Sequence, residues 1–341
     1  MILQSIASHF PEQSFTQQEC LTAMQDAEFW PQLDKRSRIL LQRVLEGDSG
    51  IEKRHFALEK LEDSWTRDAE QLNNAYEVEA PRLAVAAVEK ALKKAGLGFD
   101  EVDALFICSC TGALCPGLSS HVAEQLGLRS DIFMQDLTGF GCGATVPMLR
   151  AADGFIAQNP EAVIVTVAVE VCSAAFYVED DFGVLISTCL FGDGAAAAVW
   201  SGQGAGLELS NYQSLHFPEE REKIRFTNAG GKLRNQLDKS VPQLAAGVVE
   251  QLYQKRQLEH PRFFATHGGG RDVIEHLEAV LPVEQLTYAR EVMQHYGNLS
   301  SPSCLVALEL LLAAEPEADE IWFCGFGAGF SAHSCELRRI G

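Results

Sequence analysis

The chain has 341 residues, of which 47% are hydrophobic and 22% charged, and its formal net charge is −20. This composition is typical of a globular protein with a sizeable core, in one large domain or two ordinary ones. The negative charge excludes nucleic acid and anionic membranes as general partners, but it leaves room for an anionic ligand at a local basic patch. Met1–Phe10 lacks a signal-peptide pattern, and no apolar run approaches the roughly 20 residues of a membrane span. We therefore expect a cytoplasmic protein with no membrane partner.

Ten cysteines raise the question of zinc or disulfides, and their spacing argues against both. Cys108 and Cys110 alternate along one strand-like run, and no second close pair with zinc-finger spacing follows. Most of the cysteines lie inside apolar segments, where a reduced thiol acts as a small hydrophobic side chain. We expect no metal site.

Apolar periodicity predicts an alternation of helices and strands along the first half of the chain. In chain order, we expect helices at 17–28, 33–46 and 79–95, a strand at 104–110, a loop at 111–117, a helix to about 126, a strand at 131–137, a glycine-rich turn at 138–143, a buried helix at 144–158, a strand at 162–171 and a hairpin-like stretch at 190–200.

The second half repeats this order, with strands at 262–266 and 320–324 and helices at 272–280 and 303–314. Matching points lie at a nearly constant separation. Phe263 follows Phe106 by 157 residues, Asn298 follows Cys142 by 156, and Ile321 follows Ile164 by 157. The sequence therefore predicts an α/β fold of two pseudo-symmetric halves, residues 1–201 and 202–341.

Three polar residues fall at matching places in this scheme and are expected to meet at one central site. Cys142 lies in a glycine-rich turn that opens a helix, where backbone N–H groups and the helix dipole favour a thiolate. His267 ends a strand and precedes three glycines, and Asn298 precedes the second buried helix. Asn298 is equally consistent with a simple helix N-cap.

The ordered motifs of the chain resemble those of the chalcone-synthase-like, type III polyketide synthases, and of the bacterial members more than the plant ones. The motifs are Gly141-Cys142-Gly143-Ala144, Phe191-Gly192-Asp193-Gly194, His267-Gly268-Gly269-Gly270, Gly297-Asn298-Leu299-Ser300-Ser301 and Gly325-Phe326-Gly327-Ala328-Gly329. The resemblance implies a thiolase-like fold with αβαβα layers, a homodimer, and acyl-CoA and malonyl-CoA as substrates.

The resemblance also implies roles for individual residues. Cys142 would carry the acyl group, as a thiolate paired with an imidazolium form of His267. Asn298 and His267 would donate hydrogen bonds to the enolate formed when malonyl-CoA loses CO2. Phe191 would separate the CoA tunnel from the reaction cavity. This chemistry requires no metal and no redox cofactor.

Several pocket positions differ from the plant pattern, which puts an aromatic starter in doubt and makes an aliphatic or malonyl starter equally plausible. Ala175 stands where plant enzymes tend to have threonine, and Asn235 stands near the place of a second gatekeeper phenylalanine. The expected cavity-lining residues are Cys110, Thr111, Cys172, Ala175, Phe191, Asn235 and Ser300. For the CoA phosphates we expect basic residues at the tunnel mouth, chosen as Arg43, Arg54 and Arg271 from a wider set that includes Arg36 and Lys53.

Three other functions remain open from the sequence. A ketoacyl synthase that initiates fatty-acid synthesis also uses Cys, His and Asn, but it usually has a Gln-Ala-Asn-like run where this chain has three glycines. A cysteine hydrolase would use the same residue types in another chain order. A non-catalytic partner subunit with this fold would typically lack the cysteine. Gly325–Gly329 has no helix after it, so we do not expect a dinucleotide site.

Overall fold

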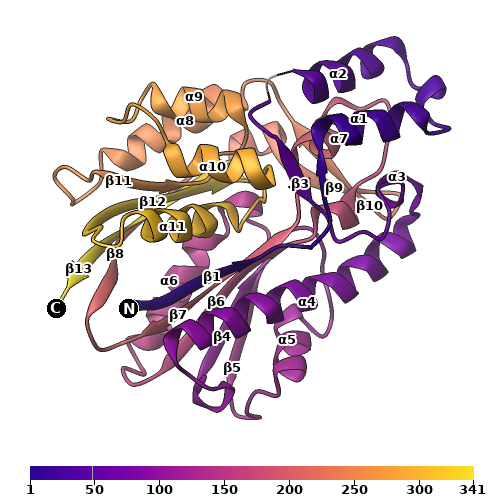
Figure 1. Ribbon diagram of the computed structural model, residues 1–341. Helices are drawn as coiled ribbons and strands as arrows, with labels where there is room; N and C mark the ends of the chain where they lie inside the picture. Colours follow the sequence, from indigo (N-terminus) through magenta and orange to yellow (C-terminus); the bar gives the residue numbers. More distant parts are fainter. Residues whose placement is uncertain (48) are drawn as a thin grey trace.

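A computed structural model describes residues 1–47 and 49–341. Its centre is one mixed sheet of nine strands (Figure 1). From one edge to the other, the strands are β11 (Phe263–Thr266), β12 (Glu320–Gly327), β13 (Ser331–Ile340), β8 (Gly206–His216), β1 (Ile2–His9), β7 (Gly194–Ser201), β6 (Val163–Glu170), β4 (Ala104–Cys108) and β5 (Phe133–Leu137).

The two halves of this sheet share one pattern of strand pairing. β4 pairs in parallel with β6, which pairs antiparallel with β7; likewise β11 pairs in parallel with β12, which pairs antiparallel with β13. Phe263 pairs with Ile321, whereas Ile164 pairs with Ala104, so the predicted offset is accurate to within about two residues. The halves meet where β1 pairs with β8. Within the described chain, β5 has no counterpart beside β11.

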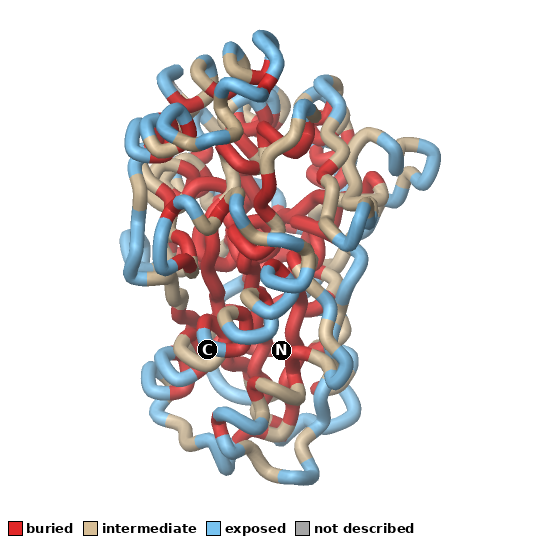
Figure 2. Tube along the Cα trace, turned by 90° about the vertical axis from the view of Figure 1, so that its right-hand side faces the viewer, coloured by how far each residue is buried: buried red, intermediate tan, exposed pale blue. Residues whose placement is uncertain are grey.

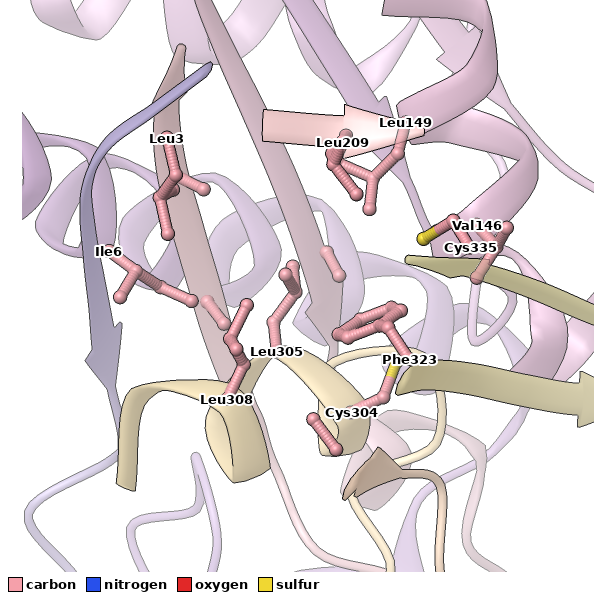
Figure 3. Close-up of a cluster of buried hydrophobic side chains, with 14 of the residues drawn as sticks. Leu3, Ile6, Val146, Leu149, Leu209, Cys304, Leu305, Leu308, Phe323 and Cys335 are labelled. Atoms are coloured by element: carbon pink, nitrogen blue, oxygen red, sulfur yellow. The ribbon is translucent and has the colours of Figure 1, made fainter. Parts of the chain in front are cut away.

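Two buried helices, α6 (Thr145–Ile156) and α11 (Ser303–Ala314), form the inner layer between the halves. They share one hydrophobic core with strands of both halves, which explains why their sequences are apolar on nearly every side. Figure 3 shows this core, and its labelled residues are Leu3, Ile6, Val146, Leu149, Leu209, Cys304, Leu305, Leu308, Phe323 and Cys335. The helices predicted at 144–158 and 303–314 are both present.

Other helices cover the outer faces, so that buried residues run through the middle of the molecule and exposed ones lie outside (Figure 2). These helices are α4 (Ala69–Ala95) and α5 (Leu118–Leu126) on the first half, and α8 (Val241–Tyr253), α9 (Arg271–Glu278) and α10 (Thr287–Tyr296) on the second. α4 begins ten residues before the predicted start, because Asp68 and Gln71 form a capping box there.

The remaining elements form a cap with a core of its own beside one end of the sheet (Figure 1). They are α1 (Gln17–Asp26), α2 (Lys35–Glu46), α3 (Asp63–Thr66), α7 (Phe182–Leu190) and the strand pairs β2 (Ser14–Thr16) with β3 (Lys53–His55) and β9 (Ile224–Ala229) with β10 (Lys232–Leu237). The expected hairpin-like stretch at 190–200 is wrong. The segment leaves the end of α7 through a turn and enters β7, which pairs with β6 and β1.

The ten cysteines all lie within the described residues, and all are free thiols. No group of three or more His, Cys, Asp or Glu side chains in this part of the chain could hold a metal ion. The same residues include no helix that combines the length and the apolar character needed to cross a membrane.

Candidate active site

The turn that carries Cys142 is shaped by glycines on both sides of it. Gly139 and Gly141 have φ angles of 90° and 55°, which glycine adopts at little cost. Cys142 lies in a short 3-10 helix, Gly141–Gly143, immediately before α6. The end of β12 packs against it at backbone distance, since a Cβ on Gly327 would come 2.9 Å from the Cys142 nitrogen. The Gly325–Gly329 motif therefore supports the turn that carries Cys142.

His267 and Asn298 approach the same place from the second half of the chain. The His267 nitrogen donates to the Cys324 carbonyl at 3.0 Å, which extends the β11–β12 pairing by one residue. Asn298 lies between α10 and α11, and its Nδ2 donates to the Gly269 carbonyl at 2.8 Å. Asn298 thereby fixes the glycine loop that follows His267. One of the two amide protons of Asn298 is left for another acceptor.

Cys142, His267 and Asn298 all line one cavity of about 520 Å³. The three side chains are buried, with 8%, 2% and 5% of their surface exposed. Phe191 lines the same cavity, and its backbone forms an isolated parallel bridge with Asn298. The duplicated scheme thus brings the three predicted residues to one site.

Burial sets the charge state of the two titratable groups. It raises the pKa of the Cys142 thiol to about 12, although a hydrogen bond from Ser300 acts in the opposite direction. It lowers the pKa of His267 to about 4. The ring of His267 packs edge-on against Phe326, and Nδ1 has no hydrogen-bond partner among the described residues. Burial therefore opposes the thiolate–imidazolium pair expected from the sequence, and that pair stays a prediction.

Behind Phe191 lies a second, much smaller space of about 20 Å³. Phe191 and Asn235 line both spaces, so both residues lie on the boundary between them. The small space is also lined by four other predicted cavity residues, Thr111, Cys172, Ala175 and Ser300. Cys110 is not among its lining residues, but its sulfur lies 3.3 Å from the Ser300 hydroxyl.

A buried carboxylate organises this inner space, and the sequence analysis did not single it out. Glu170 is fully buried at the end of β6. Its Oε2 accepts hydrogen bonds from the backbone nitrogens of Cys110 and Thr111 and from the Ser109 and Thr111 hydroxyls, while Oε1 accepts one from Ser301 at 2.5 Å. The available signal was an acidic residue inside the apolar run at 162–171, where a charge must find partners.

Two of the three expected CoA-binding arginines lie at the cavity of about 520 Å³ that holds Cys142, called the large cavity below. Arg43 of α2 and Arg271 of α9 both line it, and Arg271 is within 3.6 Å of Glu275. The expectation for Arg54 is wrong. Its side chain is 1% exposed, does not line the cavity, and donates to backbone carbonyls. Sequence position alone cannot separate a buried arginine from one at a tunnel mouth.

Comparison with solved structures places the fold among condensing enzymes of the type III polyketide synthase class. The 1,3,6,8-tetrahydroxynaphthalene synthase of Streptomyces coelicolor A3(2) matches with a TM-score of 0.88 and 26% identity, over 100% of both chains. A polyketide synthase of the brown alga Ectocarpus siliculosus matches in fold, with a TM-score of 0.91 and 22% identity over 99% of this chain and 98% of the other.

Sequence comparison agrees. Residues 6–219 match the family described as FAE1/Type III polyketide synthase-like protein, and residues 213–331 match the C-terminal domain of chalcone and stilbene synthases. A 1,3,6,8-tetrahydroxynaphthalene synthase of Streptomyces coelicolor is 30% identical over 86% of this chain and 81% of its own. A phloroglucinol synthase of Pseudomonas fluorescens is 24% identical over 95% of each chain.

The chain belongs to the type III polyketide synthase family. It is an acyltransferase that uses CoA thioesters and performs repeated condensations with malonyl-CoA, followed by cyclisation. This placement decides against the initiating ketoacyl synthase, the cysteine hydrolase and the non-catalytic subunit as alternatives.

Proposed function

We propose that Cys142, His267 and Asn298 carry out the condensation in this chain. The supporting observation is that all three line one cavity, although they come from opposite halves of the fold. Neutral His267 accepts the proton of Cys142 as its sulfur attacks the acyl-CoA thioester, and the proton then passes to the departing CoA sulfur. The acyl group is left on Cys142 as a thioester.

Malonyl-CoA then loses CO2 in the same cavity. The enolate oxygen receives hydrogen bonds from the second amide proton of Asn298 and from Nε2 of His267. The enolate carbon attacks the Cys142 thioester, so that the new carbon–carbon bond forms as the bond to the Cys142 sulfur breaks. Cys142 leaves as a thiolate, and the lengthened chain, now on CoA, can be transferred back to it.

This division of roles predicts two separable activities. Cys142→Ala should form no extended product and still release CO2 from malonyl-CoA, because the enolate donors remain. Asn298→Ala should lose both activities. A Cys142→Ala variant that makes wild-type product would overturn the assignment of the nucleophile.

We propose further that the starter is small, with malonyl itself the leading candidate. The supporting observation is the volume of about 20 Å³ behind Phe191, which leaves room for roughly one water molecule. Two relatives carry names that specify compact hydroxylated aromatics, tetrahydroxynaphthalene and phloroglucinol. A long or aromatic starter would have to displace Phe191.

Arg43 and Arg271 are proposed to bind the CoA phosphates. Both line the cavity that holds Cys142, in a chain whose net charge of −20 otherwise repels a multiply charged anion. Arg43→Ala should raise KM for malonyl-CoA with little change in kcat, because the phosphates are remote from the reacting atoms.

A homodimer is proposed, with β5 at its interface. β5 is an edge strand, and both Phe133 and Met134, on opposite faces, are at least 40% exposed. Exposed apolar edge strands are usually covered in soluble proteins. Met134→Lys should produce monomers, seen by light scattering after size exclusion.

A cytoplasmic location is proposed because ten free thiols suit a reducing compartment.

The experiment that tests the whole proposal is mass spectrometry of the products formed from malonyl-CoA with short, long and aromatic acyl-CoAs. Products from malonyl-CoA alone, lengthened by repeated two-carbon units, support the small starter. Extension that requires a long or aromatic acyl-CoA contradicts it.

A further inference from the structure

Arg54 is a buried cation whose environment the proposed reaction does not explain. Its side chain is 1% exposed, and no carboxylate in the described part of the chain forms an ion pair with it. Removing an arginine from water without a counter-charge is costly unless its donors are satisfied. Its Cζ lies 4.9 Å from the centre of the Phe56 ring, which offers a cation–π contact.

The guanidinium instead satisfies the carbonyl end of α7. Its Nη1 donates to the carbonyls of Thr188 at 2.7 Å and Phe191 at 2.9 Å, and Nε donates to Gln17 Oε1 at 3.0 Å. Gln17 in turn donates to the Cys189 carbonyl at 2.9 Å. The last carbonyls of a helix lack partners within it and carry its negative dipole end, so a cation is favoured here.

The C-terminal end of α7 also bonds Asn298, the proposed catalytic asparagine. The Asn298 nitrogen donates to the Leu190 carbonyl at 2.8 Å, and the Gly192 nitrogen donates to the Asn298 carbonyl at 3.0 Å. Phe191 and Asn298 are therefore joined by backbone on both sides of their bridge. A change in the position of one strand at this bridge must move the other.

The aliphatic part of Arg54 fills the space beside these two strands. A Cβ on Gly297 would lie 2.8 Å from Arg54 Cγ, and a Cβ on Gly192 would lie 3.6 Å from Arg54 Cβ. Gly192 follows Phe191 in the chain, and Gly297 precedes Asn298. Arg54 thus packs against the neighbours of both residues as well as bonding the end of α7.

We propose that Arg54 is a positioning residue that fixes Phe191 and Asn298 as one unit. The inference rests on the catalytic role proposed for Asn298. Arg54 contacts neither CoA nor the reacting atoms. It sets the place of the boundary residue Phe191 and, through the backbone bridge, the direction of the Asn298 amide that donates to the enolate.

The test compares Arg54→Met and Arg54→Lys with the wild type in malonyl-CoA decarboxylation and in product formation. Displacement of a catalytic donor by about 1 Å costs on the order of a hundredfold in rate. Arg54→Met should lower kcat for decarboxylation by about tenfold or more, with KM for malonyl-CoA changed less than about twofold. It should also widen the accepted starters. Arg54→Lys, which keeps the charge but not the fork of donors, should fall between the two.

Arg339→Met is a control for the loss of an arginine that bonds backbone carbonyls. Arg339 donates to the carbonyls of Pro316 and Ala318, but it is exposed and lies in β13 near the C-terminus. Its loss should leave kcat and the product pattern unchanged. If Arg54→Met does not fold, Gln17→Met removes one link of the same network and should give a smaller drop in kcat with unchanged KM.

The outcomes separate this inference from the proposed function. A wild type that never consumes malonyl-CoA defeats the proposed function. An active wild type with a folded Arg54→Met variant of equal kcat and starter range defeats the positioning role. If Arg54→Met raises only KM, as expected for Arg43→Ala, then Arg54 acts in CoA binding, and the positioning role is also defeated.

Discussion

The hydroxyl of Ser300 donates a hydrogen bond to the Cys142 sulfur over 3.2 Å. Ser300 reaches this position with a φ angle of 59°, a left-handed conformation that costs a non-glycine residue about 1–2 kcal/mol. The Ser300 nitrogen is held by Asn298 Oδ1 at 2.8 Å. In the proposed mechanism, Asn298 therefore serves the nucleophile as well as the enolate, because it fixes the residue that bonds the Cys142 sulfur.

The Ser300 hydrogen bond should make the Cys142 thiolate easier to form. A hydrogen bond of this kind contributes about 1 kcal/mol, which corresponds to roughly a fivefold change in the thiolate population. Ser300→Ala should therefore slow alkylation of Cys142 by iodoacetamide about fivefold, measured by mass spectrometry of the Cys142 peptide. Alanine has the same difficulty with the left-handed φ, so the backbone strain is unchanged. An unaltered rate would show that the bond does not act on the thiolate.

The pH dependence of Cys142 alkylation follows from the raised thiol pKa. A folded-state pKa of about 12 means that the neutral thiol dominates and that the thiolate fraction rises with pH. The alkylation rate should increase about tenfold per pH unit between pH 6 and 9. A stable ion pair with His267 would instead give a flat profile in this range. His267→Ala should keep the same slope, because the pKa of His267, about 4, keeps the ring neutral throughout.

Local patterns predicted most of the scaffold of this site, because the elements that carry it are strongly patterned. The helix at 303–314 is buried on nearly all sides, and its apolar run gives both of its ends. The separation of 156 residues between Cys142 and Asn298, close to that of the two other matching pairs, predicts the similar order of elements in the two halves. The start of α4 was missed because the apolar face weakens before residue 79, while the cap at Asp68 decides where the helix begins.

The features of the site that the sequence could not predict are those that depend on burial. Arg43 and Arg54 are both arginines, eleven positions apart. Only the packing of the folded chain shows that Arg54 is buried and that Arg43 lines the cavity. The helix dipole favours a thiolate at Cys142, and the family resemblance implies an imidazolium at His267, but burial opposes both charged forms in the folded protein. The place of each arginine and the effect of burial on the two titratable groups both depend on the tertiary environment.

Phe191 should control which starters reach the inner space. It lines both the large cavity and the space of about 20 Å³ behind it, so a smaller side chain joins the two. Phe191→Leu should increase the use of longer acyl-CoA starters relative to malonyl alone, by several-fold in competition assays read by mass spectrometry. Phe99→Leu, an exposed phenylalanine in the 3-10 helix Phe99–Glu101, is the control. A starter range equal to that of the wild type would contradict the boundary role.

Glu170 should be essential for stability, because its carboxylate is the shared acceptor of the loop that lines the inner space. Glu170→Ala leaves two backbone nitrogens, of Cys110 and Thr111, without their acceptor in a buried setting. Each unsatisfied buried donor costs about 1–3 kcal/mol, so the free energy of unfolding should fall by about 3–5 kcal/mol in chemical denaturation. Glu170→Gln should lose much less. Its amide oxygen can take the place of Oε2, and its nitrogen can donate to the Ser301 hydroxyl. Equal losses for the two variants would mean that side-chain volume matters here and hydrogen bonding does not.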